Sequence, residues 1–459
     1  MLTLSVVLLG GVLSTFALPS SPGECKPLSS LPFAHPPAVS AGLSSYVVFN
    51  NLTTPRGLRF DAQQNLLVVE RAMGISALTF RNDSTCLGWE KRVVVVKEDL
   101  GHGIEIGPGK GRNQYLYASS PESVFRWEYD PTSATVIGDP VVVAYNMTND
   151  GPNHFTRTLL LQPGPGGVPK YLIINRGGAV NLDENAANVN AGPAQIRRFR
   201  LDVPLPSQGF AWSQGELLAW GVRNGVGLAL SRDGNDLWEV ENSADDLGWQ
   251  GHDIHFDNPA EEMNRISLVN PSSIPVERKY YGYPSCFTAW NASSVPVNAS
   301  LPTFNFKTGE QFSIRLPPAM PDDAWCANPT NNIRPVLPMQ AHSAPLDLVF
   351  YDNSKCSPRA NPYGITSKWD GDAFVSFHGS WDRDPPTGYK VVRIPWAGTR
   401  PRAPPNSMSG YETLVWAPDT TQCPGNCIRP VGLAFDRLGR LFVTSDTTGE
   451  VFVIQNSGA

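Results

Sequence analysis

A basic or imidazole side chain precedes each of six similar segments of this 459-residue chain. It stands two to five positions ahead of an apolar residue that opens a strand-like stretch, and the six residues are Arg56, His102, Arg157, Arg223, His342 and Arg429. If symmetry relates the segments, these side chains ring one mouth of a central channel. Guanidinium and imidazolium groups bind carboxylates, so the pattern predicts a site for an anion. Taken singly, each residue is also typical of strand entry or of a salt bridge.

The segments that these residues precede must position them. Each segment has a short apolar stretch, often a turn of the Asp-x-x-Gly kind, and a second apolar stretch. Six such repeats, separated by tens of residues, predict a six-bladed β-propeller of the all-β class. Helical periodicity is nearly absent, whereas 41 Gly and 42 Pro punctuate the strands. We expect one propeller domain over residues 18–459, because no internal segment has the composition of a linker.

The chain start and the glycosylation motifs predict a secreted protein. Residues 1–17 contain an apolar run too short to span a bilayer and end at a small residue, as a signal peptide does. Five acceptor sequences for N-glycosylation follow, at Asn51, Asn82, Asn146, Asn291 and Asn298. We therefore expect an extracellular glycoprotein.

Seven cysteines agree with an oxidising compartment. Cys423 and Cys427 enclose three residues directly before Arg429, and a disulfide there would stiffen the rim of the predicted site. Further plausible pairs are Cys25 with Cys86, and Cys286 with either Cys326 or Cys356. One thiol is left over in either case. No C-x-x-C pair or zinc-like cluster is present.

The charge of the chain excludes two classes of partner. A net charge of −6 and a pI near 5.7 argue against nucleic acid and anionic membranes, which require a basic face. No second hydrophobic stretch predicts a membrane span.

The longest insertion runs from about Glu241 to Met339, between the fourth and fifth repeats. Its first part is rich in the oxygen ligands that Ca²⁺ prefers: Asn242, Ser243, Asp245, Asp246, Asp257, Glu261 and Glu262. A solvated acidic loop is an equally good interpretation. His252 and His255 are more typical of hydrogen-bonding residues than of metal ligands.

Three stretches resemble a known family. They are GVRNGVGLALSRDGNDLWEVENSADD from Gly221, DAFVSFHGSWDRDPPTGYKVVRIPW from Asp372 and RPVGLAFDRLGRLFVTSDTTGEVFVI from Arg429. They resemble the L-sorbosone dehydrogenase-like quinoproteins, and within these the secreted fungal pyranose dehydrogenases that use pyrroloquinoline quinone (PQQ). The resemblance runs from about Tyr46 to Ile454, and the chain is more distantly similar to the soluble glucose dehydrogenases. It implies a six-bladed propeller with the cofactor over the channel mouth.

The resemblance gives the cationic ring a ligand. PQQ is a flat tricyclic quinone with three carboxylates, which require several basic side chains and a stacking surface. Arg56, Arg223, Arg383 and Arg429 are the expected carboxylate and stacking contacts, with His102 and Arg157 completing the ring. His342, His378 and Trp381 match positions that line the cofactor cleft of the fungal family. Asn224 follows Arg223 as in the R-N-x-x-G pattern of the glucose dehydrogenases.

The same resemblance implies two Ca²⁺ sites. In the glucose dehydrogenases, two backbone carbonyls after the fourth repeat hold the ion beside the quinone, and Asn242 and Ser243 match them. A second, structural ion there uses a Glu and a backbone carbonyl, matched by Glu262 and Tyr281. The chain departs from that pattern because Asn242 and Ser243 replace a glycine-proline pair, which leaves the identity and geometry of the metal open.

The expected reaction is oxidation of a sugar by hydride transfer to PQQ. It requires a base that is neutral at working pH and takes the hydroxyl proton. His154 matches the base-bearing loop of the glucose dehydrogenases, with Arg157 downstream. Ca²⁺ would act as a Lewis acid on the quinone oxygen, and Arg223 would stabilise the developing negative charge.

The expected partners are a sugar and an external electron acceptor, with the protein acting as a monomer. By family resemblance, the acceptor candidates are a cytochrome, a lytic polysaccharide monooxygenase or a small quinone. The alternatives are a Ca²⁺-dependent propeller lactonase or phosphotriesterase, and a non-catalytic carbohydrate-binding propeller. The mainly cationic residues that lead the repeats disfavour the first alternative, since they would repel a channel-bound metal.

Overall fold

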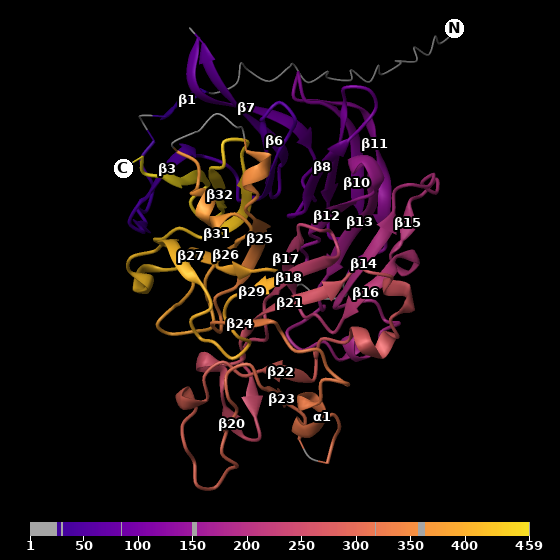
Figure 1. Cartoon of the computed structure of the whole chain (residues 1–459), viewed down its shortest axis with the longest axis vertical. Helices are drawn as coiled ribbons and strands as arrows, with labels where there is room; N and C mark the ends of the chain where they lie inside the picture. The colour runs from indigo at the N-terminus through magenta and orange to yellow at the C-terminus, as the bar shows by residue number, and fades with distance from the viewer. Residues whose placement is uncertain are drawn as a thin grey trace, which may run out of the picture.

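The computed structural model describes residues 25–28, 31–83, 85–148, 154–316, 318–356 and 363–458. These residues form six sheets of four or five strands and three smaller two-stranded sheets. Figure 1 shows the large sheets in chain order, with the first and last segments of the described chain side by side. The predicted six-bladed β-propeller is therefore confirmed. The predicted signal peptide, residues 1–17, lies outside the described residues.

Each sequence repeat forms the innermost strand of one blade and the antiparallel strand beside it. The innermost strands are β4 (Pro55–Phe60), β8 (Ile104–Pro108), β12 (Leu159–Pro163), β17 (Gly225–Leu230), β25 (Pro345–Phe350) and β31 (Pro430–Phe435). They contact one another in this order, and β31 contacts β4, so the ring is closed. The second strands are β5 (Leu66–Glu70), β9 (Gln114–Ser119), β13 (Pro169–Arg176), β18 (Asp236–Glu241), β26 (Ala373–Phe377) and β32 (Leu441–Ser445).

The outer strands complete the blades. The third strands are β6 (Gly74–Asp83), β10 (Val124–Asp130), β14 (Gln195–Arg200), β21 (Glu261–Ser267), β27 (Lys390–Ile394) and β33 (Glu450–Asn456). The fourth strands are β7 (Cys86–Val96), β11 (Thr135–Tyr145), β16 (Glu216–Trp220), β24 (Leu337–Met339), β30 (Glu412–Trp416) and β3 (Leu43–Phe49). Short fifth strands, β1 (Cys25–Pro27), β15 (Phe210–Ala211) and β2 (Ala38–Val39), extend three blades. Because β3 pairs with β33, both ends of the chain build the last blade.

Breaks in strand register recur near the start of the innermost strands. They lie between Pro55 and Leu58, Gly225 and Gly227, Pro345 and Asp347, and Pro430 and Leu433. A bulge of this kind bends a strand and redirects its side chains. The breaks lie at or just after the basic residues of these four repeats, which is how the blades turn those residues toward the mouth.

Neighbouring blades pack through apolar faces. Phe374 and Val391 of the fifth blade share one buried cluster with Leu433 and Phe452 of the sixth. Burial of such side chains stabilises each blade only when its neighbour is present. The core of the molecule therefore lies between the blades, and the loops at the mouth are held by it.

The segment from Glu241 to Met339 is not a single insertion, contrary to the sequence interpretation. It supplies β21 and β24, the two outer strands of the fourth blade. The remainder forms the hairpin of β19 (Gly248–Trp249) and β20 (His252–Asp253), the pair β22 (Cys286–Thr288) and β23 (Gln311–Ser313), and helix α1 (Asp323–Ala327). These elements project from the bottom of the molecule in Figure 1. A third small pair consists of β28 (Trp396–Ala397) and β29 (Arg400–Pro401).

Three disulfides join Cys25 to Cys86, Cys286 to Cys326 and Cys423 to Cys427. Cys356 is free. The sequence predicted these pairs but left the partner of Cys286 open. Among the described residues, no helix is long and apolar enough to cross a membrane.

Candidate active site

Four residues form a charged cluster where blades one, five and six meet. Three of them were predicted from the sequence, and the fourth, Asp446, was not. Arg56, the second residue of β4, donates to Asp446 Oδ2 at 2.7 Å. Asp446 directly follows β32 and accepts from His378 Nε2 at 2.9 Å. Arg429 donates to His378 Nδ1 at 2.9 Å and to its carbonyl at 3.2 Å. The cluster joins two guanidinium groups through one imidazole and one carboxylate.

These bonds fix the protonation states of the cluster. Nδ1 of His378 accepts from Arg429, so its Nε2 carries the proton that Asp446 accepts, and the ring is neutral. Burial lowers the pKa of His378 to about 4 despite the neighbouring carboxylate. Burial alone would raise the pKa of Asp446, but His378, Arg56 and Arg429 lower it below its ordinary value. The cluster thus has two cations and one anion, and a net positive charge.

Two buried nitrogen atoms in or beside this cluster have no hydrogen-bond partner among the described residues: Nε of Arg56 and Nδ1 of His102. His102 is 3% exposed and lies two residues ahead of β8. Burial, together with Arg56, holds its pKa well below the ordinary value, so the ring is neutral. Unpaired buried polar atoms are costly. Their position beside a positive cluster fits an anionic ligand that carries hydrogen-bonding atoms.

Arg223, 3% exposed, lies in a second cluster on blade four. Its guanidinium donates to the carbonyls of Asn242 (3.1 Å) and Ser243, and to Asp245 Oδ2 at 3.1 Å. The two carbonyls that the family resemblance assigns to Ca²⁺ thus contact a guanidinium. Asn224, the next residue, is half-buried, and its Oδ1 has no hydrogen-bond partner.

His154 lies against the same region, since a side chain on Gly177 would collide with His154, Arg223 and Asn224. Its Nδ1 is 2.8 Å from the carbonyl of Gly178, which can only accept, so Nδ1 carries the proton and Nε2 the lone pair. Burial, and then Arg223, lower the pKa of His154 to about 3. His154 is therefore a neutral imidazole with a lone pair on Nε2, which a general base requires.

Arg157 is placed differently from the other members of the predicted ring. It is 1% exposed, and its guanidinium donates to the carbonyls of His154 (2.8 Å), Thr156 (2.7 Å) and Met147 (2.7 Å). Burial and the neighbouring Arg176 lower its pKa to about 9. In this structure Arg157 holds the backbone that carries His154.

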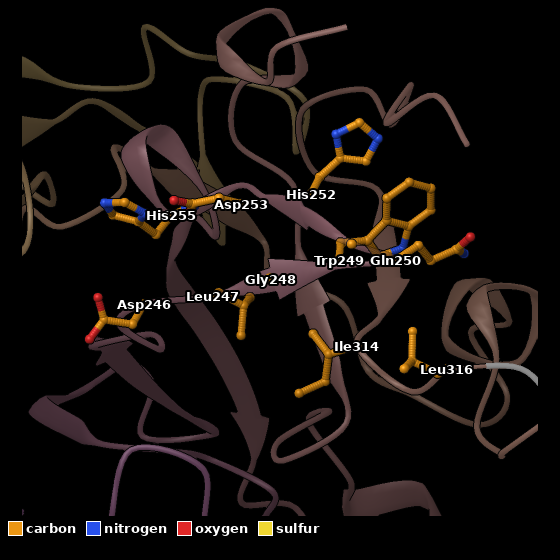
Figure 2. A pocket seen from close by; sticks show the side chains of 11 residues that line it. Asp246, Leu247, Gly248, Trp249, Gln250, His252, Asp253, His255, Ile314 and Leu316 are labelled. Carbon is orange, nitrogen blue, oxygen red and sulfur yellow. Dashed lines mark hydrogen bonds and ion pairs between the residues drawn. The ribbon is translucent and has the colours of Figure 1, made fainter. Parts of the chain in front are cut away.

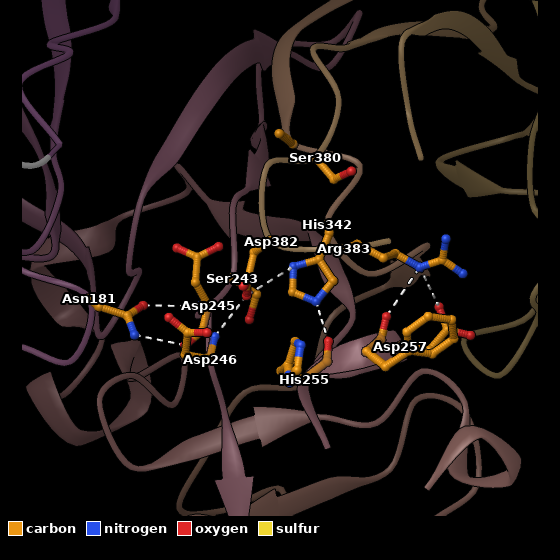
Figure 3. Close-up of polar contacts among 12 residues, drawn as sticks. Asn181, Ser243, Asp245, Asp246, His255, Asp257, His342, Ser380, Asp382 and Arg383 are labelled. Carbon is orange, nitrogen blue, oxygen red and sulfur yellow. Dashed lines mark hydrogen bonds and ion pairs between the residues drawn. The ribbon is translucent and has the colours of Figure 1, made fainter. Parts of the chain in front are cut away.

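A group with metal-binding side chains lies beside Arg223. One ligand atom each of Asp245, His342 and Asp382 lies within 4.8 Å of the others (Figure 3). His342 Nε2 donates to the carbonyl of His255, and its Nδ1 lies 3.9 Å from Asp382 Oδ2. Nδ1 and the two carboxylates are side-chain atoms of the kinds that coordinate divalent cations. This donor set fits a divalent ion better than the two carbonyls that contact Arg223.

The loop after His378 carries Trp381 and Arg383. Trp381 is 69% exposed, which is unusual for so large an apolar surface. Arg383 lies over the ring of Phe256, 4.6 Å from its centroid, with its Nε 3.7 Å from Asp257. Trp381 therefore offers a free stacking surface, and Arg383 fastens this loop to the segment after β20.

Glu262 lies in a buried acidic face of blade four. Asn264 Nδ2 is within 3.1, 3.3 and 3.2 Å of carboxylate oxygens of Glu239, Glu241 and Glu262. Burial raises the pKa of Glu262 to about 7 and those of Glu239 and Glu241 above their ordinary value. None of these carboxylates forms a salt bridge among the described residues. Tyr281 is buried nearby, with its hydroxyl bonded to the carbonyl of Arg265 at 2.7 Å.

Asp446 and Asp382 were not predicted from the sequence. A signal for Asp446 was present, because it directly follows the second strand of the sixth repeat, as His378 follows that of the fifth and Asn242 that of the fourth. Asp382 lies within the motif HGSWDR, between two residues that were identified.

The chain is similar to a known family over most of its length. The TrAA12-like family model matches residues 37–457. A pyrroloquinoline quinone-dependent sugar dehydrogenase of Hypocrea jecorina is 35% identical, over 94% of this chain and 92% of that protein. A pyrroloquinoline quinone-dependent pyranose dehydrogenase of Coprinopsis cinerea is 34% identical over 96% of this chain, which spans 56% of that protein's length.

Among solved structures, the calcium structure of a family AA12 carbohydrate-active enzyme of Trichoderma reesei is similar, with a TM-score of 0.79. It is 34% identical, and the match covers 93% of this chain and 98% of that one. The similarity thus extends over nearly the whole propeller, including the loops that carry the candidate site.

Proposed function

This chain belongs to the TrAA12-like family, and on that premise we propose that it oxidises a pyranose or related sugar with bound PQQ. Electrons then pass to an external acceptor. One observation carries the assignment to this part of the molecule: Arg56, His378 and Arg429 form a positive cluster around Asp446, beside a nitrogen of His102 that is unpaired among the described residues. A tricarboxylate such as PQQ fits this combination of charge and unpaired hydrogen-bonding atoms.

When bound, PQQ supplies the electrophile that accepts the hydride from the sugar carbon. His154 takes the hydroxyl proton at Nε2, because Nδ1 is occupied by the carbonyl of Gly178. Arg157 positions His154 by bonding its carbonyl. Arg223 supplies positive charge next to the base.

The remaining predicted residues are assigned to binding. Arg56, Arg429 and His102 would hold the carboxylates of PQQ, His378 and Asn224 would supply further polar contacts, and Trp381 would supply the stacking surface. Arg383 would act indirectly, because it holds the loop that carries Trp381 against the segment after β20. Asp245, His342 and Asp382 supply ligands for Ca²⁺ beside the carbonyls of Asn242 and Ser243, and Glu262 belongs to a second, structural Ca²⁺ site near Tyr281.

The experiment is a titration of the purified chain with PQQ in the presence of Ca²⁺, followed by absorbance and tryptophan fluorescence. Tight one-to-one binding, with sugar-dependent reduction of a dye acceptor only after loading, is the expected result. No binding of PQQ would contradict the proposal. Lactone or phosphotriester hydrolysis by unloaded protein would favour the hydrolase, and sugar binding without either activity would favour a non-catalytic propeller.

We further propose that the protein is a secreted, monomeric glycoprotein with one propeller domain over residues 18–459. A cytochrome, a lytic polysaccharide monooxygenase or a small quinone would accept its electrons. Four of the five predicted glycosylation sites, Asn51, Asn82, Asn146 and Asn298, are exposed, and Asn291 is half-buried. The exposed positions support this assignment.

A further inference from the structure

The hairpin β19–β20 lines a cavity of about 490 Å³ beside the candidate active site (Figure 2). Its wall runs from Asp246 through the hairpin to His255 and is completed by Ile314 and Leu316. Small-molecule sites typically have volumes of about 300 to 1,000 Å³. The cavity is therefore large enough for a small organic ligand, and no residue of the proposed PQQ site lines it.

Hydrogen bonds join the wall of this cavity to the mouth of the propeller. The backbone N–H of Asp246 donates to Asp382 Oδ2 at 2.8 Å, and His342 Nε2 donates to the carbonyl of His255 (Figure 3). Arg383 Nε donates to the next carbonyl after His255 at 3.1 Å. The cavity and the candidate active site thus lie on either side of one shared wall.

The lining of the cavity is amphipathic. Asp246, Asp253 and His255 gather on one side in Figure 2, whereas Ile314 and Leu316 lie on the other. Asp253 Oδ1 and His255 Nδ1 are 2.5 Å apart, and this bond raises the pKa of His255. Sugar rings combine hydroxyls with apolar C–H faces, which such a lining matches. Among the described residues, the lining has two carboxylates, Asp246 and Asp253, one cationic side chain, His255, and neither Lys nor Arg, so its net charge is negative and disfavours an anionic ligand.

The floor of the cavity is preformed. Trp249 is 4% exposed and packs against Phe304, with ring centroids 5.3 Å apart. His252 stacks on Trp249, and its Nε2 donates to the carbonyl of Pro302 at 2.7 Å. A rigid floor lowers the entropic cost of binding.

We propose that this cavity is a second sugar subsite. It holds a neutral or amino-bearing sugar unit that is glycosidically linked to the unit oxidised at the mouth, and it discriminates against uronic acid units. The inference rests on the proposed function, which supplies the first unit. It extends the substrate class from monosaccharides to oligosaccharides and glycosides.

The test measures binding by calorimetry, so that it does not depend on turnover. The probes are methyl glycosides of glucose, galactose and fucose, each compared with a disaccharide glycoside that ends in the same unit. We expect at least one disaccharide to bind about tenfold or more tightly than its monosaccharide. Leu316→Asp should remove this preference, whereas Val297→Asp should retain it, because Val297 is an exposed apolar residue of the same segment outside the cavity.

Equal affinity for both members of every pair, or a preference that survives Leu316→Asp, would overturn the subsite. Leu316 is 64% exposed, so unchanged thermal melting is the expected control for folding. For charge selection, a disaccharide with an outer glucosamine should bind about tenfold or more tightly than its glucuronic acid counterpart. Equal binding of the two would overturn that part.

Failure of the proposed function is distinguishable from failure of the subsite. If the PQQ-loaded protein oxidises monosaccharides but shows no disaccharide preference, only the subsite is wrong. If the preference is present but no sugar is oxidised after loading with PQQ, only the proposed oxidation is wrong.

Discussion

The surroundings of His154 suit the proton transfer that we propose for it. Its φ of 51° is unusual for a residue other than glycine, and it places the ring so that Nδ1 reaches the carbonyl of Gly178. Burial and the positive charge of Arg223 then keep the ring neutral, with a pKa of about 3. A base must be unprotonated to act, and this environment ensures it at any physiological pH.

We expect His154→Gln to lower kcat by about 10²- to 10⁴-fold while PQQ affinity stays close to wild type, because general-base catalysis typically contributes that much. Steady-state kinetics and PQQ titration measure the two effects. The same substitution tests the two rival imidazoles, in His342→Gln and His102→Gln. If either of these loses turnover while His154→Gln keeps it, the base belongs to another blade.

The pH profile gives an independent test of the same residue. A histidine with an ordinary pKa would be protonated below pH 6.5 and would lose activity there. The lowered pKa of His154, about 3, keeps the base neutral well below that range. We therefore expect kcat of the loaded enzyme to show no histidine-like fall between pH 7 and about pH 4.5. A fall centred near pH 6.5 would contradict the assignment.

We expect Arg429 to act on the cofactor both directly and through its neighbour His378. Because it donates to Nδ1 of His378, it selects the tautomer that bonds Asp446. We expect Arg429→Ala to weaken PQQ binding by about 2 to 5 kcal/mol, the usual cost of leaving a buried charge unpaired. Thermal melting should change little, and Arg437→Ala, on the exposed turn of the same blade, should leave PQQ affinity unaltered. Unchanged affinity in Arg429→Ala would refute its role.

At the scale of elements, the fourth blade differs from the others in carrying a buried acidic face. Strand pairing sets Glu239 opposite Asn264 and Glu241 opposite Glu262, so that all four side chains lie on one side of the sheet. The exposed fractions of these residues are 0, 0, 5 and 6%, respectively. Burying three carboxylates together is costly unless they share protons or bind a cation.

We predict that Ca²⁺ stabilises the protein more at pH 8 than at pH 5.5. The pKa of Glu262 is about 7, so protons compete with the ion below that pH. At a free Ca²⁺ concentration of 100 Kd the gain would be about 2.7 kcal/mol. Thermal melting with Ca²⁺ and with EGTA at both pH values measures it. Glu262→Gln should reduce the effect and Asp139→Asn, on the exposed part of β11, should not; the absence of any Ca²⁺ effect at pH 8 in the wild type would contradict the site.

At the scale of the whole molecule, ring closure depends on β3. This strand precedes the first repeat but pairs with β33, the last strand of the chain. Val47 and Phe49 of β3 are 0 and 1% exposed and belong to the clusters on either side of the sixth blade. The geometry of the mouth, where Arg56 meets Asp446, is therefore maintained by a contact between the two ends of the sequence.

We expect Phe49→Ala to lower the free energy of unfolding by about 3 to 5 kcal/mol, as loss of a buried aromatic side chain usually does. Phe80→Ala is the matched control, since Phe80 is 43% exposed on β6, and it should cost less than about 1 kcal/mol. Urea denaturation measures both. Similar losses in the two variants would indicate that the closing strand is not critical for stability.

The amino-acid sequence by itself determined the architecture and supplied many residues of the candidate site, but not Asp446 or Asp382. Strand alternation and turn residues are local, so six repeats are visible without any three-dimensional information. The basic residues ahead of the strands were identified for the same reason, and so was the disulfide between Cys423 and Cys427. The sequence predicted that all six of these side chains ring the channel mouth. Arg157 differs, because its guanidinium donates to the backbone around His154.

The tertiary structure decided which residues meet. Asp446 and Arg56 are 390 positions apart, and they meet only because the ring closes. His342 donates a hydrogen bond to the carbonyl of His255. His255 lies in the segment between two strands of the fourth blade, and no sequence repeat specifies the path of that segment. The choice of Cys326 rather than Cys356 as the partner of Cys286 has the same origin. Local periodicity specifies strands, whereas partners across loops depend on how the blades and the inserted segment pack together.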